Sequence, residues 1–163
     1  MRPHVEGLEQ RGLAATAIDL PLRAAEAAVP VYRERAAAAG PAAELVIGGQ
    51  SYGGRVASLL AAADGAYAGL VCFSYPLHRP GQPEWQPRTE HWPGLTLPVL
   101  LLSGESDPFA RVDLLRRAVA ERLPSARLVT FPGQGHSLQA VLPDALDATA
   151  EFVRSLRSAT ARS

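Results

Sequence analysis

The chain has 163 residues, 47% hydrophobic and 20% charged, which is the size and composition of one soluble globular domain. Its 16 basic and 16 acidic residues give no net charge, which argues against a nucleic-acid or anionic-membrane partner. The one cysteine, Cys72, excludes an internal disulfide framework and is predicted to be a small buried side chain. No metal-ligand spacing, long apolar stretch or signal peptide is visible, so we expect a cytoplasmic protein without a metal or other cofactor.

Apolar runs alternate with helical patterns along the chain. In chain order the patterns predict a helix over residues 1–11, a strand over 13–18, a helix over 23–39, a strand over 45–48, a helix over 52–63, strands over 70–73 and 99–103, a helix over 110–123, a strand over 128–131 and a helix over 138–156. Pro30 is expected to start, kink or divide the second helix. Continuous apolar strands separated by helices are typical of a parallel sheet covered on both faces. We therefore predict a single three-layer α/β domain over residues 1–157, with about five mostly parallel strands and a frayed tail over 158–163.

The stretch over residues 75–98 differs in composition from the rest of the chain. Its six prolines exclude a helix or a central strand, and it also carries both tryptophans, Trp85 and Trp92. We interpret it as an ordered loop at the ligand-binding end of the sheet. The predicted substrate pocket is lined by Gln50, Tyr75, Trp85 and Trp92.

The sequence Gly-Gly-Gln-Ser-Tyr-Gly-Gly at residues 48–54 contains the pattern G-x-S-x-G, with Ser51 at its centre. An apolar strand precedes it and a helical stretch follows, which is the context of a nucleophile elbow. Such a turn strains the serine backbone, and glycines two residues to either side let strand and helix approach closely. The alternative is a plain glycine-rich turn.

A serine nucleophile needs a histidine base, and the histidine needs a carboxylate to orient it. Asp107 follows the strongest predicted strand, and His136 follows the last one. Loops after parallel strands gather at one end of the sheet, so Ser51, Asp107 and His136 are predicted to meet there as a catalytic triad. The backbone N–H of Tyr52 would stabilise the oxyanion.

Each of these residues has a simpler interpretation. Asp107 could be a helix N-cap followed by Pro108, and Glu105 is a weaker candidate for the acid. His136 could be an ordinary loop residue, although Gly133 and Gly135 imply an unusual backbone path there. The other histidines, His4, His78 and His91, are interpreted as solvated or hydrogen-bonded surface groups.

The order Ser51, Asp107, His136 is that of α/β-hydrolases. With the motifs Gly-Gly-Gln-Ser-Tyr-Gly-Gly-Arg-Val-Ala-Ser at 48–58, Ser-Tyr-Pro-Leu-His at 74–78, Ser-Gly-Glu-Ser-Asp-Pro-Phe at 103–109 and Gly-Gln-Gly-His at 133–136, the chain resembles small α/β-hydrolases. It is similar to the branch that includes dienelactone hydrolases and the α/β-hydrolase-like subunits of the non-specific-lethal chromatin complex. Dienelactone hydrolases use a cysteine nucleophile, so their substrate is not carried over.

The resemblance implies a strand and a His-Gly-type loop before the first helix, and nothing in the chain matches them. That loop supplies one oxyanion donor, and losing such a donor costs about 100-fold or more in rate. The sequence therefore predicts an N-terminally truncated fold whose activity is compromised. A misassigned start, which we favour, a degenerate form and a partner that completes the sheet all remain open.

The sequence predicts a serine hydrolase that acts on a small ester or thioester. The alternative is a non-catalytic binding module on the same fold, and incomplete sheet edges would favour a homodimer. A nucleotide-binding glycine loop is disfavoured, because Gln50 occupies the middle glycine position of G-x-G-x-x-G.

Overall fold

The computed structural model describes residues 2–82 and 88–160. Within these residues the sheet has four parallel strands in the order β1-β2-β3-β4, namely β1 (Val46–Gln50), β2 (Gly69–Phe73), β3 (Val99–Gly104) and β4 (Arg127–Phe131). Each strand lies beside its successor in the chain, and parallel pairing brings all the carboxyl ends to one edge of the sheet. The loops that carry the predicted triad start from this edge.

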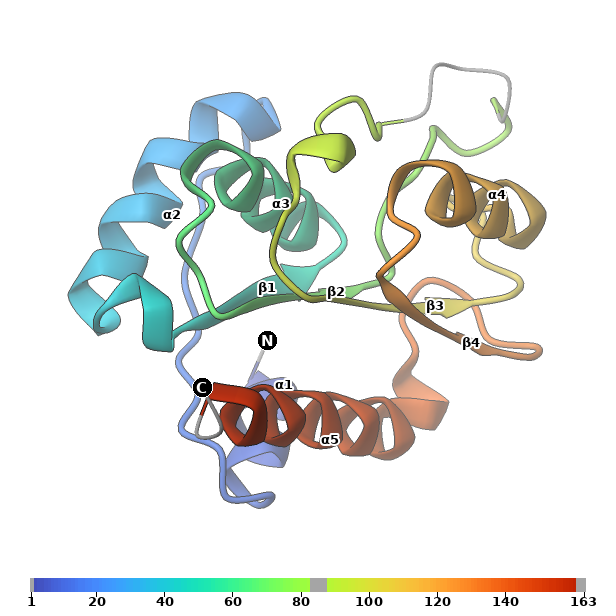
Figure 1. Cartoon of the computed structure of the whole chain (residues 1–163). Coiled ribbons are helices and arrows are strands. Elements are labelled where there is room, and N and C mark those ends of the chain that lie inside the picture. Colours follow the sequence, from blue (N-terminus) through green and yellow to red (C-terminus); the bar gives the residue numbers. More distant parts are fainter. Residues whose placement is uncertain (1, 83–87, 161–163) are drawn as a thin grey trace.

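Helices cover both faces of the sheet, so the predicted three-layer α/β fold is confirmed (Figure 1). One layer contains α2 (Ala25–Ala39), α3 (Tyr52–Asp64) and α4 (Val112–Arg122); the other contains α1 (Arg2–Glu9) and α5 (Leu142–Thr160). Short 3-10 turns at Ala42–Glu44, Trp92–Gly94 and Gln139–Val141 complete the regular structure of the described residues.

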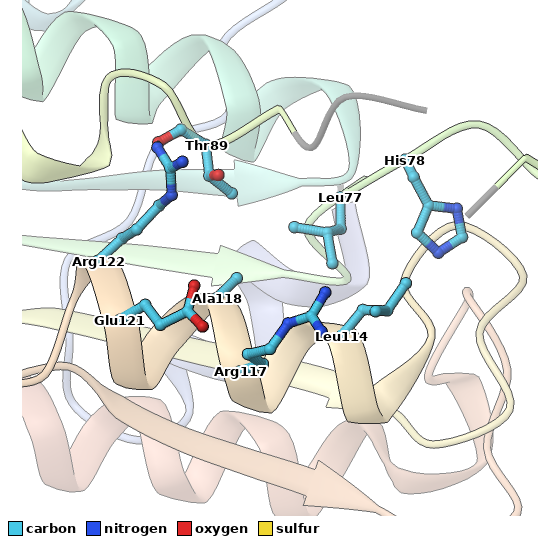
Figure 2. A pocket seen from close by; sticks show the side chains of 8 residues that line it. All are labelled: Leu77, His78, Thr89, Leu114, Arg117, Ala118, Glu121 and Arg122. Carbon is cyan, nitrogen blue, oxygen red and sulfur yellow. The ribbon is translucent and has the colours of Figure 1, made fainter. Parts of the chain in front are cut away.

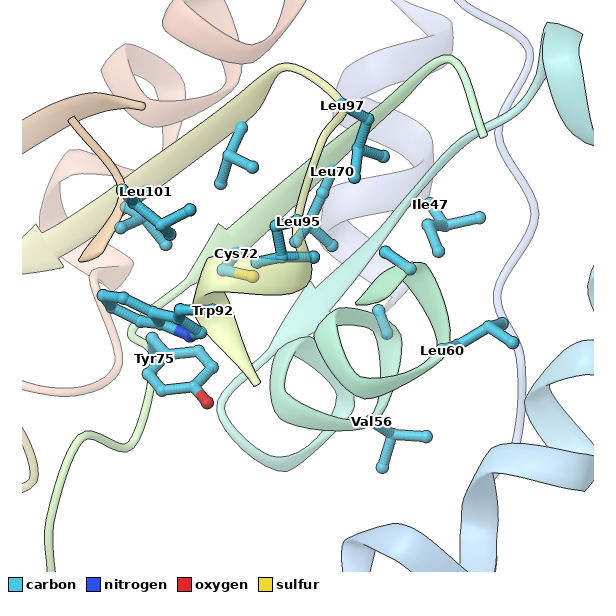
Figure 3. Packing of buried hydrophobic residues seen from close by; sticks show 14 of the residues in the cluster. Ile47, Val56, Leu60, Leu70, Cys72, Tyr75, Trp92, Leu95, Leu97 and Leu101 are labelled. Atoms are coloured by element: carbon cyan, nitrogen blue, oxygen red, sulfur yellow. The ribbon is translucent and has the colours of Figure 1, made fainter. Parts of the chain in front are cut away.

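Alternate side chains of the strands divide the core into two clusters. On β2, Leu70 and Cys72 belong to the larger cluster under α2, α3 and α4, whereas Val71 and Phe73 belong to the cluster under α5. In the larger cluster (Figure 3), Leu60 of α3 packs in the same group as these β2 side chains and is fully buried. The continuous apolar strands of the sequence therefore reflect a sheet that is buried on both faces.

The predicted strand over residues 13–18 is absent, and the prediction of five strands is wrong for the described residues. This segment instead runs irregularly from α1 on one face of the sheet to α2 on the other (Figure 1). It does not pair with β1, whose outer edge is bonded to a side chain of α2. The Tyr32 hydroxyl donates to the Gly48 carbonyl at 2.7 Å and accepts the Gly48 N–H at 3.0 Å. At Gly48 the polar groups of this edge are therefore bonded to a side chain and not to a neighbouring strand.

Two further details differ from the prediction. The helix α2 continues through Pro30 from Ala25 to Ala39, so the proline neither starts nor divides it. The helix α5 runs to Thr160, so residues 158–160 of the predicted frayed tail are helical, and residues 161–163 lie outside the described part.

Candidate active site

Ser51 is the single residue between the end of β1 and the start of α3. Its backbone angles are φ 49° and ψ −115°, a conformation that non-glycine residues rarely adopt. A Cβ on Gly49 would lie 2.6 Å from the backbone carbon of Gly53, so only glycine lets strand and helix pack this closely. The second close approach comes from Gly54, whose Cβ would lie 2.8 Å from the Gly49 oxygen. A Cβ on Gly53 would meet nothing within 4 Å, so the prediction that Gly53 prevents a clash is wrong.

The structure brings Ser51, His136 and Asp107 together from three separate loops. His136 Nε2 lies 2.8 Å from Ser51 Oγ, and His136 Nδ1 lies 2.8 Å from Asp107 Oδ2. A carboxylate oxygen only accepts a hydrogen bond, so Nδ1 is protonated and its N–H donates a hydrogen bond to Asp107. Nε2 is then free to accept the Ser51 O–H, which is the geometry that the predicted roles require.

Asp107 uses its two oxygens for different partners. While Oδ2 accepts from His136, Oδ1 accepts the backbone N–H of Phe109 at 2.8 Å. The helix α4 begins at Val112 with Arg111 at its N-cap position, so Asp107 is not its cap. The other acid candidate, Glu105, pairs with Arg116 at 2.7 Å and accepts the Thr130 hydroxyl at 2.8 Å. Of the two acid candidates, Asp107 is the one bonded to His136.

The loops that carry Asp107 and His136 are bonded to each other through their backbones. Ser106 N–H donates to the Gln134 carbonyl at 2.9 Å, and Gly133 has a φ of 70°, as the predicted unusual path requires. The ring of Phe109 also packs on the His136 imidazole, with 4.4 Å between ring centroids. The histidine is therefore held both by its acid partner and by an aromatic neighbour.

Asp107 is more buried than the other two residues of the array. The Asp107 side chain is fully buried, the His136 side chain is 24% exposed, and Ser51 is partly exposed. A buried carboxylate interacts strongly with its imidazole, because little water screens the pair. The hydroxyl is the last group of the hydrogen-bonded series, and it lies at the N-terminus of α3 beside Tyr52. The first N–H groups of a helix have no partner within the helix, so the Tyr52 N–H suits an oxyanion.

Of the residues predicted to line the substrate pocket, one lies beside the triad and two lie in the hydrophobic core. Gln50 lies next to the triad, where its Nε2 donates to the Ser137 carbonyl at 3.4 Å. Tyr75 and Trp92 are each 1% exposed and pack against each other in the core with 5.2 Å between ring centroids (Figure 3). Because both rings are buried in the larger core cluster, they are not exposed walls of a pocket. Trp85 lies outside the described residues.

Two of the remaining histidines are less exposed than predicted. His4 is buried and packs edge-on against Phe73 with 5.0 Å between ring centroids. His91 Nε2 donates to Ser58 Oγ at 2.8 Å, because the Ser58 hydroxyl gives its proton to the Arg55 carbonyl. Burial, and then the charge of Arg55, lower the pKa of His91 to about 4. His78 is also buried, so the interpretation as surface groups is wrong for His4 and His78. His91 is partly exposed and hydrogen-bonded, which agrees with that interpretation.

Cys72 is 1% exposed, as predicted for a small buried side chain. Burial raises the pKa of its thiol to about 12, so the reactive thiolate is not formed near neutral pH.

A hollow of about 100 Å³ lies between α4 and the described part of the loop after β2, and Ser51 is not among the residues that line it (Figure 2). Its lining includes Leu77, His78 and Thr89 on the loop, and Leu114, Arg117 and Arg122 on α4. Among the described residues, no group of three or more histidine, cysteine, aspartate or glutamate side chains is arranged to hold a metal ion. Nor is any described helix both long and apolar enough to span a bilayer.

The chain matches the family model described as "Alpha/beta hydrolase domain" over residues 21–160, and it belongs to this family. Solved structures share the fold. A monoacylglycerol lipase from Paleococcus ferrophilus is 15% identical with a TM-score of 0.79, over 94% of this chain and 88% of the lipase. A puromycin-hydrolyzing peptidase from Mycobacterium tuberculosis is 20% identical with a TM-score of 0.61, over 79% of this chain and 25% of the peptidase.

A third similar structure, described as a predicted CIB-like hydrolase from Thermoplasma acidophilum, is 20% identical with a TM-score of 0.64, over 80% of this chain. The matched region spans 60% of that protein's length. The similarity to dienelactone hydrolases and to non-specific-lethal complex subunits stays a prediction.

Proposed function

We propose that the chain is a serine hydrolase of small esters or thioesters, with Ser51 as nucleophile, His136 as general base and Asp107 as the acid that orients it. The observation that carries the proposal is the pair of 2.8 Å bonds that join Ser51 Oγ, His136 and Asp107. Membership of an α/β hydrolase family and the fold shared with a lipase and a peptidase support a hydrolytic reaction.

The mechanism follows from the hydrogen bonds. His136 Nε2 takes the Ser51 proton as Oγ attacks the acyl carbon, and the imidazolium is stabilised by the buried Asp107. The backbone N–H of Tyr52 donates to the developing oxyanion. His136 then gives its proton to the leaving alcohol or thiol, and the acyl-enzyme is hydrolysed by a water that His136 deprotonates.

The sequence offers a non-catalytic binding module as the alternative. Such a module has no need of a strained serine that is hydrogen-bonded to an oriented histidine. The backbone of Ser51, at φ 49° and ψ −115°, costs about 1–3 kcal/mol, which a reacting serine explains.

A fluorophosphonate probe tests the proposal. We expect the wild type to be labelled and Ser51→Ala to be unlabelled. Ser58→Ala is the matched control, because Ser58 also bonds a histidine but is buried and gives its proton to a carbonyl. It should be labelled like the wild type. A wild type that neither reacts with the probe nor hydrolyses a short-chain p-nitrophenyl ester, or labelling that survives Ser51→Ala, would contradict the proposal.

A further inference from the structure

His78 closes the motif Ser-Tyr-Pro-Leu-His at residues 74–78, and the proposed chemistry does not use it. Its side chain is 3% exposed and lies between the loop after β2 and the start of α4 (Figure 2). Burial of a ring with two polar nitrogens is costly unless both nitrogens are bonded. The partners of these nitrogens therefore show what the residue does.

Three hydrogen bonds define the position of His78. Its backbone N–H donates to the Phe109 carbonyl at 3.0 Å, and its Nε2 accepts the backbone N–H of Arg111 at 3.0 Å. Its Nδ1 lies 2.8 Å from the Arg79 carbonyl. A backbone N–H only donates and a carbonyl only accepts, so the ring has its proton on Nδ1 and none on Nε2. Two of the three bonds thus reach the segment that follows Asp107.

Phe109 links His78 to the triad. Its carbonyl is held by His78, while its N–H donates to Asp107 Oδ1 at 2.8 Å. Its ring packs on the His136 imidazole at 4.4 Å between centroids. The residues between Asp107 and α4 are therefore fixed on one side by His78 and on the other by the Asp107–His136 pair.

We propose that His78 is a positioning residue, which holds residues 107–111 in the geometry that lets Asp107 orient His136. The Nε2 bond to Arg111 N–H is the decisive contact, because it is made by the side chain and not by the backbone. The expected effect on rate rests on the proposed function, whereas the expected effect on His136 itself does not.

Two substitutions of His78 by an amide side chain distinguish the roles of its two ring nitrogens. In His78→Gln the amide reaches about as far as Nε2 and can accept the Arg111 N–H. In His78→Asn the shorter amide reaches only as far as Nδ1 and its Arg79 partner. Arg122→Met is the matched control, because Arg122 bonds the Thr89 carbonyl at 3.4 Å and joins the same loop to the opposite end of α4 (Figure 2).

Two readouts are measured on each variant. The first is the second-order rate of fluorophosphonate labelling at Ser51. The second is the tautomer of His136, read from imidazole ¹⁵N shifts in ¹⁵N-histidine-labelled protein. We expect His78→Asn to lower the labelling rate by about tenfold or more, as small misplacements of catalytic groups do, and His78→Gln by less than about threefold. We expect His136 to stay an Nδ1–H tautomer in His78→Gln and to become a tautomer mixture in His78→Asn.

Equal effects of the two amides, or a loss in Arg122→Met as large as that in His78→Asn, would overturn the positioning role. So would a His136 tautomer that is unchanged in both position-78 variants. The two proposals fail differently: a wild type that does not label refutes the hydrolase, while the ¹⁵N shifts still decide the role of His78. Circular dichroism shows whether His78→Asn is folded. If it is not, His78→Gln decides alone: the proposal requires His136 to remain the Nδ1–H tautomer in this variant, and loss of that tautomer counts against it.

Discussion

At the scale of single residues, the serine elbow depends on where a Cβ can be accommodated. Ser51 lies in a strained conformation with a positive φ, and its neighbours keep that strain in place. Gly49 packs directly against the backbone of Gly53 and Gly54, so its missing side chain is a structural requirement. Gly53 faces open space, and its glycine is not needed for packing.

These two glycines make a matched pair of substitutions. Gly49→Ala should lower the free energy of unfolding by about 1–3 kcal/mol or more, because the new methyl overlaps backbone atoms that cannot move freely. Gly53→Ala should leave that free energy unchanged or raise it by up to about 1 kcal/mol, since alanine suits a helix better than glycine. Urea unfolding followed by circular dichroism measures both. Equal losses of unfolding free energy in the two variants would contradict the inference that only Gly49 is required for packing.

At the scale of elements, the backbone groups of Gly48 at the outer edge of β1 are bonded by a side chain and not by another strand. Tyr32 of α2 places one hydroxyl on both the N–H and the carbonyl of Gly48. Burial raises the pKa of Tyr32 to about 12, so the hydroxyl stays protonated and donates over the whole neutral range. A side chain from the covering helix thus bonds both polar groups that Gly48 presents at this edge.

Tyr32→Phe should lower the free energy of unfolding by about 1–3 kcal/mol, because both polar groups of Gly48 lose their partner in a partly buried place. Tyr52→Phe is the comparison, since the Tyr52 hydroxyl donates only to the carbonyl of Pro21 in a loop, at 2.9 Å. There water can take over more easily, and we expect a loss below about 1 kcal/mol. Chemical denaturation at neutral pH gives both values. A smaller loss for Tyr32→Phe than for Tyr52→Phe would contradict the edge-capping role.

At the scale of the whole molecule, two histidines, the buried His4 and the partly buried His91, make both layers sensitive to acid. His91 packs on α3 on one face, and His4 of α1 packs against Phe73 on the other. Burial lowers the pKa of both, to about 4 for His91 from the ordinary 6.5. Between these two pH values the unfolded chain binds more protons than the folded one, so stability rises with pH. The contribution of His91 is complete above about pH 6.5 and disappears toward pH 4.

We therefore expect the urea midpoint to fall as the pH is lowered from 7 to 4. In His4→Leu and His91→Gln the fall should be smaller, because neither replacement titrates and glutamine can still donate to Ser58. The two sites lie on opposite faces of the sheet, so their effects should add in the double variant. Urea titrations at pH 4, 5, 6 and 7 measure this, and a double variant as acid-sensitive as the wild type would refute the assignment.

Much of the fold and of the candidate site could be predicted from the sequence, because the signals are local. Apolar runs marked four of the strands, and Gly-x-Ser-x-Gly between a strand and a helix located the elbow. Polar residues directly after two strands located Asp107 and His136. Each of these depends on neighbours a few residues apart and on the rule that parallel strands end at one edge.

Pairing between distant residues was decided only by the tertiary structure. Residues 13–18 are mostly apolar but form no strand, and at the outer edge of β1 the polar groups of Gly48 are bonded to Tyr32 instead. Tyr75 and Trp92 are in the core, and the choice between Asp107 and Glu105 depended on which carboxylate the His136 ring reaches. His78 gave no sequence signal beyond its motif, since the two partners that join it to the segment after Asp107, Phe109 and Arg111, are far from it in the sequence. Helix and strand propensity depends on residues that are adjacent in the sequence. Long-range hydrogen-bond partners and burial are decided only when the chain folds and brings distant residues together.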